Sequence, residues 1–249
     1  MGNIETDRDG RVFQIRLNNP ETLNSLTPEL LRDLIKVCGE LSEDEMSRIV
    51  VLEGTGANFS SGADLPAFNK GLASTPHETA DVGRLAVEAL ADLPQITLAK
   101  IRGHCVGGAV VLAAACDLRI AAGDARFWIP ELDAGIPLAW GGWAHLVRLV
   151  GETMATDMVL GAEPFDAEAA QQARFVSRVI GAGDLDTETA ALVAAIARKP
   201  DLPLRRTKRQ LLSIRSGTFD ASTDADGLLA AFNDPEAGQV LRSYADRLG

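Results

Sequence analysis

The alternation of short apolar runs with segments of helical periodicity constrains the fold of this 249-residue chain more than any other feature. Residues 48–52, 96–101 and 117–121 are mainly apolar runs of strand length. Residues 78–93 carry apolar side chains at helical spacing, and residues 109–115 are small and apolar enough for a closely packed helix. The resulting order of strand, helix, strand, helix, strand predicts an α/β core.

The N-terminal segments carry clear turn and capping signals. Residues 4–17 predict a β-hairpin that turns at Asp9–Gly10. A helix is expected to follow Thr27, because threonine is a good N-cap and Pro28 is favoured at the first helical position.

Two later segments are expected to lie at the surface. Residues 66–77 predict a variable loop. From about Thr187 the sequence is helical and more charged. We interpret the basic run at residues 205–209 as a solvated helix face.

The composition limits the classes of partner. Hydrophobic residues make up 46% of the chain and charged residues 24%, as is typical of a soluble globular enzyme. The formal net charge of −11 argues against sequence-independent binding of nucleic acid, which needs a basic surface. An anionic small molecule remains compatible, because local basic side chains or helix N-termini can hold phosphates.

The cysteines and the apolar runs predict a cytoplasmic protein that does not enter a membrane. Cys38, Cys105 and Cys116 are odd in number and lie in apolar stretches, which favours buried, reduced thiols. Residues 1–5 contain no apolar signal segment. The longest run without polar residues, 105–116, is too short to span a bilayer.

Two glycine-containing loops, residues 61–65 and 103–109, follow predicted strands. Glycine lets the backbone turn sharply and expose its N–H groups. Gly108 also lies near the start of a predicted helix, where unpaired amides carry partial positive charge. One amide from each loop could bind a developing oxyanion, although each loop alone equally fits a tight turn. Asp64 could cap the turn that follows it.

Glu131 is the strongest candidate for acid/base chemistry. It lies between proline, leucine and isoleucine residues in the segment 129–137. Such surroundings predict partial desolvation, which raises the pKa of a carboxyl group and suits it to proton transfer near neutral pH. Taken alone, the same residue could be a surface loop residue or a helix cap.

Four segments, in this order, resemble the enoyl-CoA hydratase/isomerase (crotonase) family; they are residues 19–27, 54–65, 103–121 and 127–149. The resemblance extends from Ile4 to about Ile180. It implies an α/β spiral of ββα turns in residues 1–195 and a C-terminal helical oligomerisation region in residues 196–249. It also implies a homotrimer or hexamer.

The same resemblance implies the roles of individual residues. The backbone N–H groups of Ala63 and Gly108 match the oxyanion hole for a thioester oxygen, and Glu131 matches one of two catalytic glutamates. Thr22 stands where many members have a basic residue, so one phosphate contact is absent. No cofactor is implied, since coenzyme A is part of the substrate. The substrate-binding positions are Leu23, Ala63, Asp64, Leu65, Pro66 and Gly108.

The second glutamate of the family's hydratases is replaced by Val111 in this chain. Valine can neither hold a water molecule nor move a proton, and loss of a positioned acid/base group costs about 10²–10⁴-fold in rate. Moving a double bond needs only one base and an oxyanion hole. The resemblance therefore favours an enoyl-CoA isomerase with Glu131 as its acid/base. The alternatives are an enoyl-CoA hydratase, a catalytically silent acyl-CoA-binding protein, and a hydrolase of thioesters or β-dicarbonyl compounds.

The remaining candidates have simpler interpretations. Asp133 could be the nucleophile of a hydrolase, but a loop cap is favoured. The three histidines, His77, His104 and His145, are interpreted as satisfied packing residues rather than catalytic ones, and no cluster of histidine and cysteine has metal-ligand spacing. The segment after the glutamate loop is Trp140, Gly141, Gly142 and Trp143. Its two tryptophans are expected to shape the core or an acyl pocket.

Overall fold

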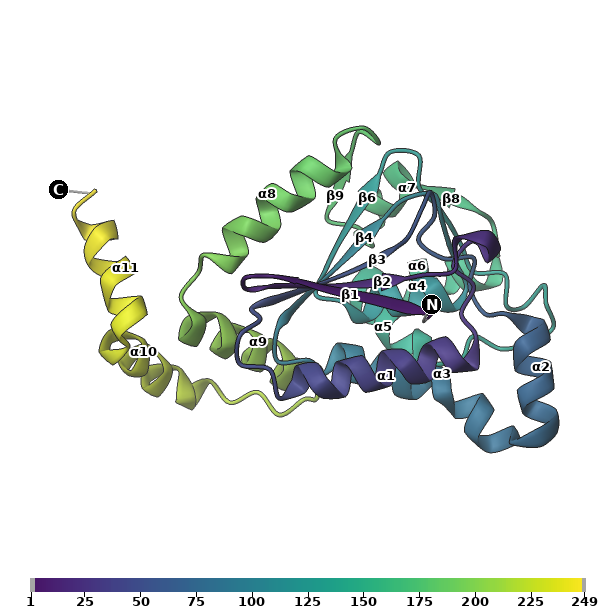
Figure 1. The fold of residues 1–249 in the computed structure, drawn as a ribbon, viewed down its shortest axis with the longest axis horizontal. Helices are drawn as coiled ribbons and strands as arrows, with labels where there is room; N and C mark the ends of the chain where they lie inside the picture. Colours follow the sequence, from purple (N-terminus) through teal and green to yellow (C-terminus); the bar gives the residue numbers. More distant parts are fainter. Residues whose placement is uncertain (1–2, 248–249) are drawn as a thin grey trace.

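The computed structural model describes residues 3–247 and confirms the α/β class. A six-stranded sheet of order β1-β2-β3-β4-β6-β9 runs through the middle of the molecule (Figure 1). Only β1 and β2 pair antiparallel; the other neighbours are parallel. The strands are β1 (Ile4–Asp9), β2 (Val12–Leu17), β3 (Ile49–Gly54), β4 (Ile96–Ile101), β6 (Leu118–Ala122) and β9 (Arg178–Ile180).

A second sheet has three strands in the order β5-β7-β8. Its strands are β5 (His104–Val106), β7 (Arg126–Trp128) and β8 (Phe165–Asp166). In the chain, β5 and β7 each lie between a strand of the large sheet and a helix. Strands β4 and β5 precede helix α4 (Gly108–Ala115), and strands β6 and β7 precede helix α5 (Gly142–Val150). This repeated order of two strands and a helix confirms the predicted spiral of ββα turns.

The N-terminal predictions are confirmed. Strands β1 and β2 pair in register from Ile4 opposite Leu17 to Asp9 opposite Val12, with Gly10 in the turn at φ +56°. Glycine adopts this left-handed conformation without the steric penalty that a β-carbon brings.

The inner strands β3, β4 and β6 are buried on both faces, which explains their apolar runs. Alternate residues of a strand point to opposite faces. In β3, Val50 and Leu52 join the larger core with the helices on one side, whereas Ile49 and Val51 pack toward helix α8 (Leu185–Ala197) on the other. Figure 1 shows α8 across one face of the sheet and α1 and α3–α5 on the opposite side. Parallel strands buried in this way have few polar positions.

The helices of the larger core follow their capping signals. Helix α1 (Pro28–Ser42) begins as predicted, with the Thr27 hydroxyl accepting a hydrogen bond of 3.1 Å from the Leu30 amide. The remaining helices of the spiral are α2 (Leu65–Ser74), α3 (Pro76–Ala91), α6 (Glu152–Leu160) and α7 (Ala167–Gln172), with a 3-10 turn, η1 (Pro20–Thr22).

The prediction of a loop at residues 66–77 is wrong, because helix α2 and the start of α3 occupy it. The Asp64 carboxylate caps α2 by accepting a hydrogen bond of 2.9 Å from the Ala67 amide. Pro66 stands in the first turn, where its missing N–H costs nothing. Phe68 is then the side chain of α2 that is buried against the core. The cap was noted in the sequence, but the helix that it begins was missed.

The interpretation of residues 205–209 as a solvated face is wrong for Lys208. Lys208 lies on helix α9 (Asp201–Arg215), and its side chain is only 1% exposed. Its ammonium group donates a hydrogen bond of 2.7 Å to Asp117, a buried carboxylate that also accepts one from Arg215. The run therefore includes an internal ion pair that joins α9 to the sheet.

The chain ends in helices α10 (Asp224–Asn233) and α11 (Pro235–Ala245), which follow a 3-10 turn, η2 (Ala221–Thr223). Figure 1 shows both helices extending beyond the sheet, and Glu236 at the start of α11 forms an ion pair of 2.6 Å with Arg48. The predicted boundary after residue 195 lies within the last turn of α8, and the division into two regions stays a prediction. Among residues 3–247, the structure contains no helix with the length and apolar character needed to cross a membrane.

Candidate active site

A cavity of about 160 Å³ brings together the residues that carry the predicted chemistry. Ala63, Gly108 and Glu131 all line it, although they are far apart in the sequence. Val111 also lines it, one helical turn beyond Gly108. Most of the remaining wall is apolar and comes from α2 and from residues 136–140.

The two glycine-containing loops run side by side and form one end of this cavity. The Ser60 amide donates to the His104 carbonyl oxygen at 2.9 Å, and the Val106 amide donates to the Ser60 carbonyl oxygen at 3.1 Å. A β-carbon at Gly62, where φ is +87°, would lie 2.5 Å from the Val106 carbonyl oxygen. Glycine at this position therefore lets the two backbones meet, and it places Ala63 beside the start of α4.

The backbone amides of Ala63 and Gly108 are free donors. Within the described part of the chain, neither amide donates a hydrogen bond to a protein group. The Gly108 amide belongs to the first residue of α4, where the helix dipole adds partial positive charge. Two unpaired donors at one small cavity suit a ligand oxygen that gains negative charge.

Gly107 brings the Glu131 side chain against the same backbone. Its φ of +54° is a left-handed value, and a β-carbon there would lie 2.7 Å from Oε1 of Glu131. The Glu131 carboxyl group is thus in contact with the residue that immediately precedes the free amide of Gly108. Acid/base group and amide donor therefore lie at one place, as proton transfer next to a carbonyl group requires.

Glu131 is desolvated, as the sequence predicted. Oε2 is buried, and no donor among residues 3–247 reaches it. Burial raises the pKa of Glu131 above its ordinary value, and a hydrogen bond from its own backbone opposes this in part. A raised pKa makes this carboxyl group better suited to general acid/base catalysis than an exposed glutamate.

The described lining of the cavity contains no second carboxylate. Val111, which is 1% exposed, contributes an apolar side chain to the wall. Asn69 is a further polar side chain of the wall, and it is exposed to solvent. Asp133 is exposed and lies outside the wall, and it makes no side-chain hydrogen bond in the described structure, so neither of its predicted roles finds support.

Of the other predicted substrate-binding residues, some line the cavity and some do not. Leu65 lines it, whereas Pro66 is exposed outside it and Asp64 uses its carboxylate as the cap of α2. Leu23 is left-handed at φ 55° and exposed, and its carbonyl oxygen accepts a hydrogen bond of 2.9 Å from the Ser61 amide. It thus lies next to the first loop, outside the cavity wall.

Trp140 and Phe68 belong to the cavity more fully than the sequence indicated. Both line it, and their ring centroids are 5.9 Å apart. Trp140 had been assigned to the core or to a pocket, and it serves both. Phe68 was missed because it lay in the predicted loop. Trp143, by contrast, is 39% exposed and is absent from the wall.

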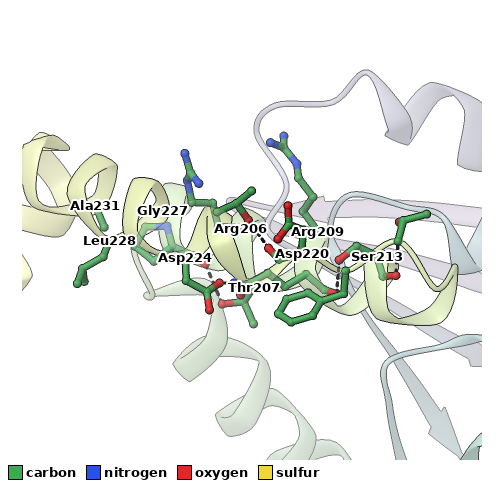
Figure 2. A pocket seen from close by; sticks show the side chains of 14 residues that line it. Arg206, Thr207, Arg209, Ser213, Asp220, Asp224, Gly227, Leu228 and Ala231 are labelled. Carbon is green, nitrogen blue, oxygen red and sulfur yellow. Dashed lines mark hydrogen bonds between the residues drawn. The ribbon is translucent and has the colours of Figure 1, made fainter.

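A larger cavity, of about 390 Å³, lies between α9 and α10 and carries none of the predicted site residues. Figure 2 shows Arg206 and Arg209 extending to the same side, with Asp220 and Asp224 close by. Gln210 donates a hydrogen bond of 2.8 Å to Asp224 across it. The mixed charges and open setting provide no acid/base pair, so the small cavity at Glu131 is the better candidate.

The histidines and cysteines take no part in the small cavity. His77 and His104 are exposed, so the packing interpretation is wrong for these two. His145 lies partly buried on α5, where burial together with Arg148 lowers its pKa to about 4. The three cysteines are free and buried, as predicted. Among the described residues, no group of three or more histidine, cysteine or acidic side chains could hold a metal ion.

Comparison with known proteins agrees with this geometry. A family model described as enoyl-CoA hydratase/isomerase matches residues 7–226. The 2,3-dehydroadipyl-CoA hydratase of Escherichia coli is 33% identical over 244 residues, covering 96% of this chain and 94% of that protein. A mitochondrial Delta(3,5)-Delta(2,4)-dienoyl-CoA isomerase of Rattus norvegicus is 29% identical over 234 residues, covering 88% of this chain and 71% of that protein.

A solved structure has the same fold over nearly the full length. The crystal structure of an enoyl-CoA hydratase/carnithine racemase from Magnetospirillum magneticum matches with a TM-score of 0.92 at 27% identity, covering 99% of this chain and 94% of that one. The relatives thus include both hydratases and an isomerase. The chain belongs to the enoyl-CoA hydratase/isomerase (crotonase) family.

Proposed function

We propose that this chain isomerises the double bond of an enoyl-CoA thioester, with Glu131 as its single acid/base. The observation that supports this most directly is that Glu131, with its Oε2 atom buried, is the only carboxylate among the described residues that line this mainly apolar cavity, which Val111 also lines. Hydration needs an ordered water molecule that attacks C3, and this cavity offers one carboxyl group to hold it. Double-bond migration needs no water, and apolar walls favour it by excluding water from the intermediate.

The reaction follows from these groups. The thioester oxygen accepts hydrogen bonds from the Ala63 and Gly108 amides, and the ionised Glu131 carboxylate removes a proton from C2 of a 3-enoyl-CoA. The electron pair of the broken C–H bond then moves through the conjugated system, and the negative charge rests on the oxygen. The protonated Glu131 returns the proton to C4, which leaves the double bond between C2 and C3. No cofactor is required, and each oxyanion donor contributes on the order of 3 kcal/mol to the barrier reduction.

An enoyl-CoA hydratase is the second candidate, because relatives such as that of E. coli carry hydratase names. An assay with 3-enoyl-CoA, 2-enoyl-CoA, release of free CoA and binding of saturated acyl-CoA separates the alternatives. We expect this chain to move the double bond of the 3-enoyl-CoA. We expect it to hydrate the 2-enoyl-CoA at a rate about 10²-fold or more below its isomerisation rate, because hydration lacks a second acid/base group. Equal or faster hydration would favour the hydratase. Release of CoA would favour a hydrolase, and binding without turnover would favour a silent binding protein.

We also propose that copies of this chain associate through the C-terminal helices into a homotrimer or hexamer. Apolar side chains of α10 and α11 are widely exposed, among them Leu228 at 62%, Phe232 at 56% and Tyr244 at 55%. Exposed patches of this kind mark interaction surfaces. Light scattering is expected to give three or six times the mass of one chain. A single-chain mass at micromolar concentration would contradict the proposal.

The three buried, free thiols fit a reducing compartment such as the cytoplasm.

A further inference from the structure

The indole ring of Trp140 forms part of the cavity wall and fills the space between two helices. A β-carbon at Gly108, the first residue of α4, would lie 2.1 Å from Cζ3 of Trp140. A β-carbon at Gly83, on α3, would lie 2.0 Å from Cε2 of the same ring. The indole therefore occupies room that exists only because both helices carry glycine at the contact.

The backbone is held in an unusual conformation to place this ring. Trp140 has a φ of +59°, which is rare for a bulky residue and costs conformational energy. The side chain is nevertheless buried, and Phe68 of α2 packs against it. Residues of three helices, α2, α3 and α4, therefore pack around the ring.

The volume left in front of the ring is small. The cavity measures about 160 Å³, and Trp140 lies directly against the residue whose amide is the proposed oxyanion donor. An apolar cavity of about 150 Å³ holds one benzene-sized ligand, that is, about six carbon atoms. Ligand pockets for larger molecules are usually at least about 300 Å³.

We infer that Trp140 sets the acyl-chain length and restricts the enzyme to short acyl groups of about six carbons or fewer. This inference rests on the proposed function only in placing the thioester at the Ala63 and Gly108 amides. Beyond about six carbons, further methylene groups meet the indole and gain no buried contact. Trp140 is thus a specificity-determining residue, and Gly83 and Gly108 are the positions that admit it.

The test measures binding of saturated acyl-CoA thioesters with 4, 6, 8 and 10 carbons by calorimetry, so that it needs no turnover. A buried methylene group adds about fourfold in affinity. For the unaltered chain we expect affinity to rise from 4 to 6 carbons and then to level or fall. Trp140→Ala is expected to let the rise continue to 8 or 10 carbons. Trp143→Ala, which removes an exposed indole three residues away, is the matched control and should keep the original limit.

The outcomes separate this inference from the proposed reaction. Affinity that keeps rising to 10 carbons in the unaltered chain would overturn the inference, and so would an unchanged limit in a folded Trp140→Ala protein. If Trp140→Ala does not fold, as circular dichroism would reveal, the series with the unaltered chain still decides, and Phe68→Ala enlarges the cavity beside the same ring. A short-chain limit without isomerase activity would reject the proposed reaction and leave this inference standing.

Discussion

Replacing Glu131 by glutamine is expected to lower kcat for double-bond migration by about 10²–10⁴-fold, the usual effect of removing a positioned acid/base group. Glutamine keeps the shape that packs against Gly107 but cannot take a proton from C2 or return one to C4. Because the Ala63 and Gly108 amides are untouched, the Kd for a saturated acyl-CoA should change much less than kcat. Steady-state kinetics with a 3-enoyl-CoA and calorimetry with its saturated analogue measure the two effects.

Asp133→Asn is the matched control for this substitution. It neutralises a carboxylate two residues away that is exposed and outside the cavity wall. It should leave kcat within a factor of about two, in line with the small effects of surface substitutions. Isomerase activity that survived in Glu131→Gln, or that disappeared in Asp133→Asn, would contradict the assignment of Glu131 as the proton carrier.

The pH dependence supplies a second readout of the same carboxyl group. Glu131 must be ionised to accept a proton, and burial raises its pKa above the ordinary value. The rate should therefore fall on the acid side at a pH above that expected for an exposed glutamate, whose pKa is about 4.3. The raised pKa also means that the folded state binds the proton of Glu131 more tightly than the unfolded state does, so protonation of Glu131 stabilises the fold. That contribution to stability is present at low pH and is lost as the pH rises through the folded-state pKa.

The sign of this linkage predicts how Glu131→Gln behaves as a folded protein. At pH 7 the substitution replaces a poorly solvated acid by a neutral amide, so urea unfolding should show unchanged or higher stability. A loss of activity with retained stability would assign the effect to chemistry. A large loss of both would indicate that Glu131 holds the loop in place.

The largest effect on stability is expected from Asp117→Ala, which should lower the free energy of unfolding by about 3–5 kcal/mol. Asp117 accepts hydrogen bonds from the amide and hydroxyl groups of Thr97, from Lys208 and from Arg215. Without it, Lys208, whose side chain is 1% exposed, keeps a charge with no anion beside it. Breaking one member of a buried ion pair is costly for this reason.

Urea unfolding followed by circular dichroism measures the Asp117 effect, and Asp124→Ala is its control. Asp124 lies exposed in the turn after β6, so its loss should change stability by no more than about 0.5 kcal/mol. Because Lys208 and Arg215 both belong to α9, Asp117→Ala should also loosen α9 from the sheet. Equal stability of the two variants would mean that the ion pairs contribute nothing net.

The local signals in the sequence determined much of the fold. The hairpin at Asp9–Gly10 and the helix after Thr27 follow from short-range turn and capping chemistry, which needs no distant partner. The inner strands β3, β4 and β6 were predictable because burial on both faces leaves them few polar residues, whereas the short strand β9 was not predicted. The same locality made Glu131 recognisable as a desolvated carboxylate, since its apolar neighbours are adjacent in the chain.

The pairing of Ala63 with Gly108 as one site was predictable only through resemblance to a known family. Each loop by itself equally fits a tight turn, and the contact between them depends on the approach of Gly62 to Val106. Helix α2 was missed because the Asp64 cap indicates only where a helix can begin. The burial of Phe68 against the core, which stabilises the helix, depends on residues distant in the sequence.

Only the tertiary structure decided which polar and aromatic side chains are enclosed. The sequence predicts a surface cation at Lys208, but the fold brings Asp117, which is 91 residues away in the sequence, beside it. For Trp140 the sequence predicts a place in the core or in an acyl pocket, and only the tertiary structure shows that Gly83 and Gly108 leave room for its ring. The physical reason is the same in both cases. Burial and charge pairing depend on residues distant in sequence, whereas periodicity and capping depend on neighbours.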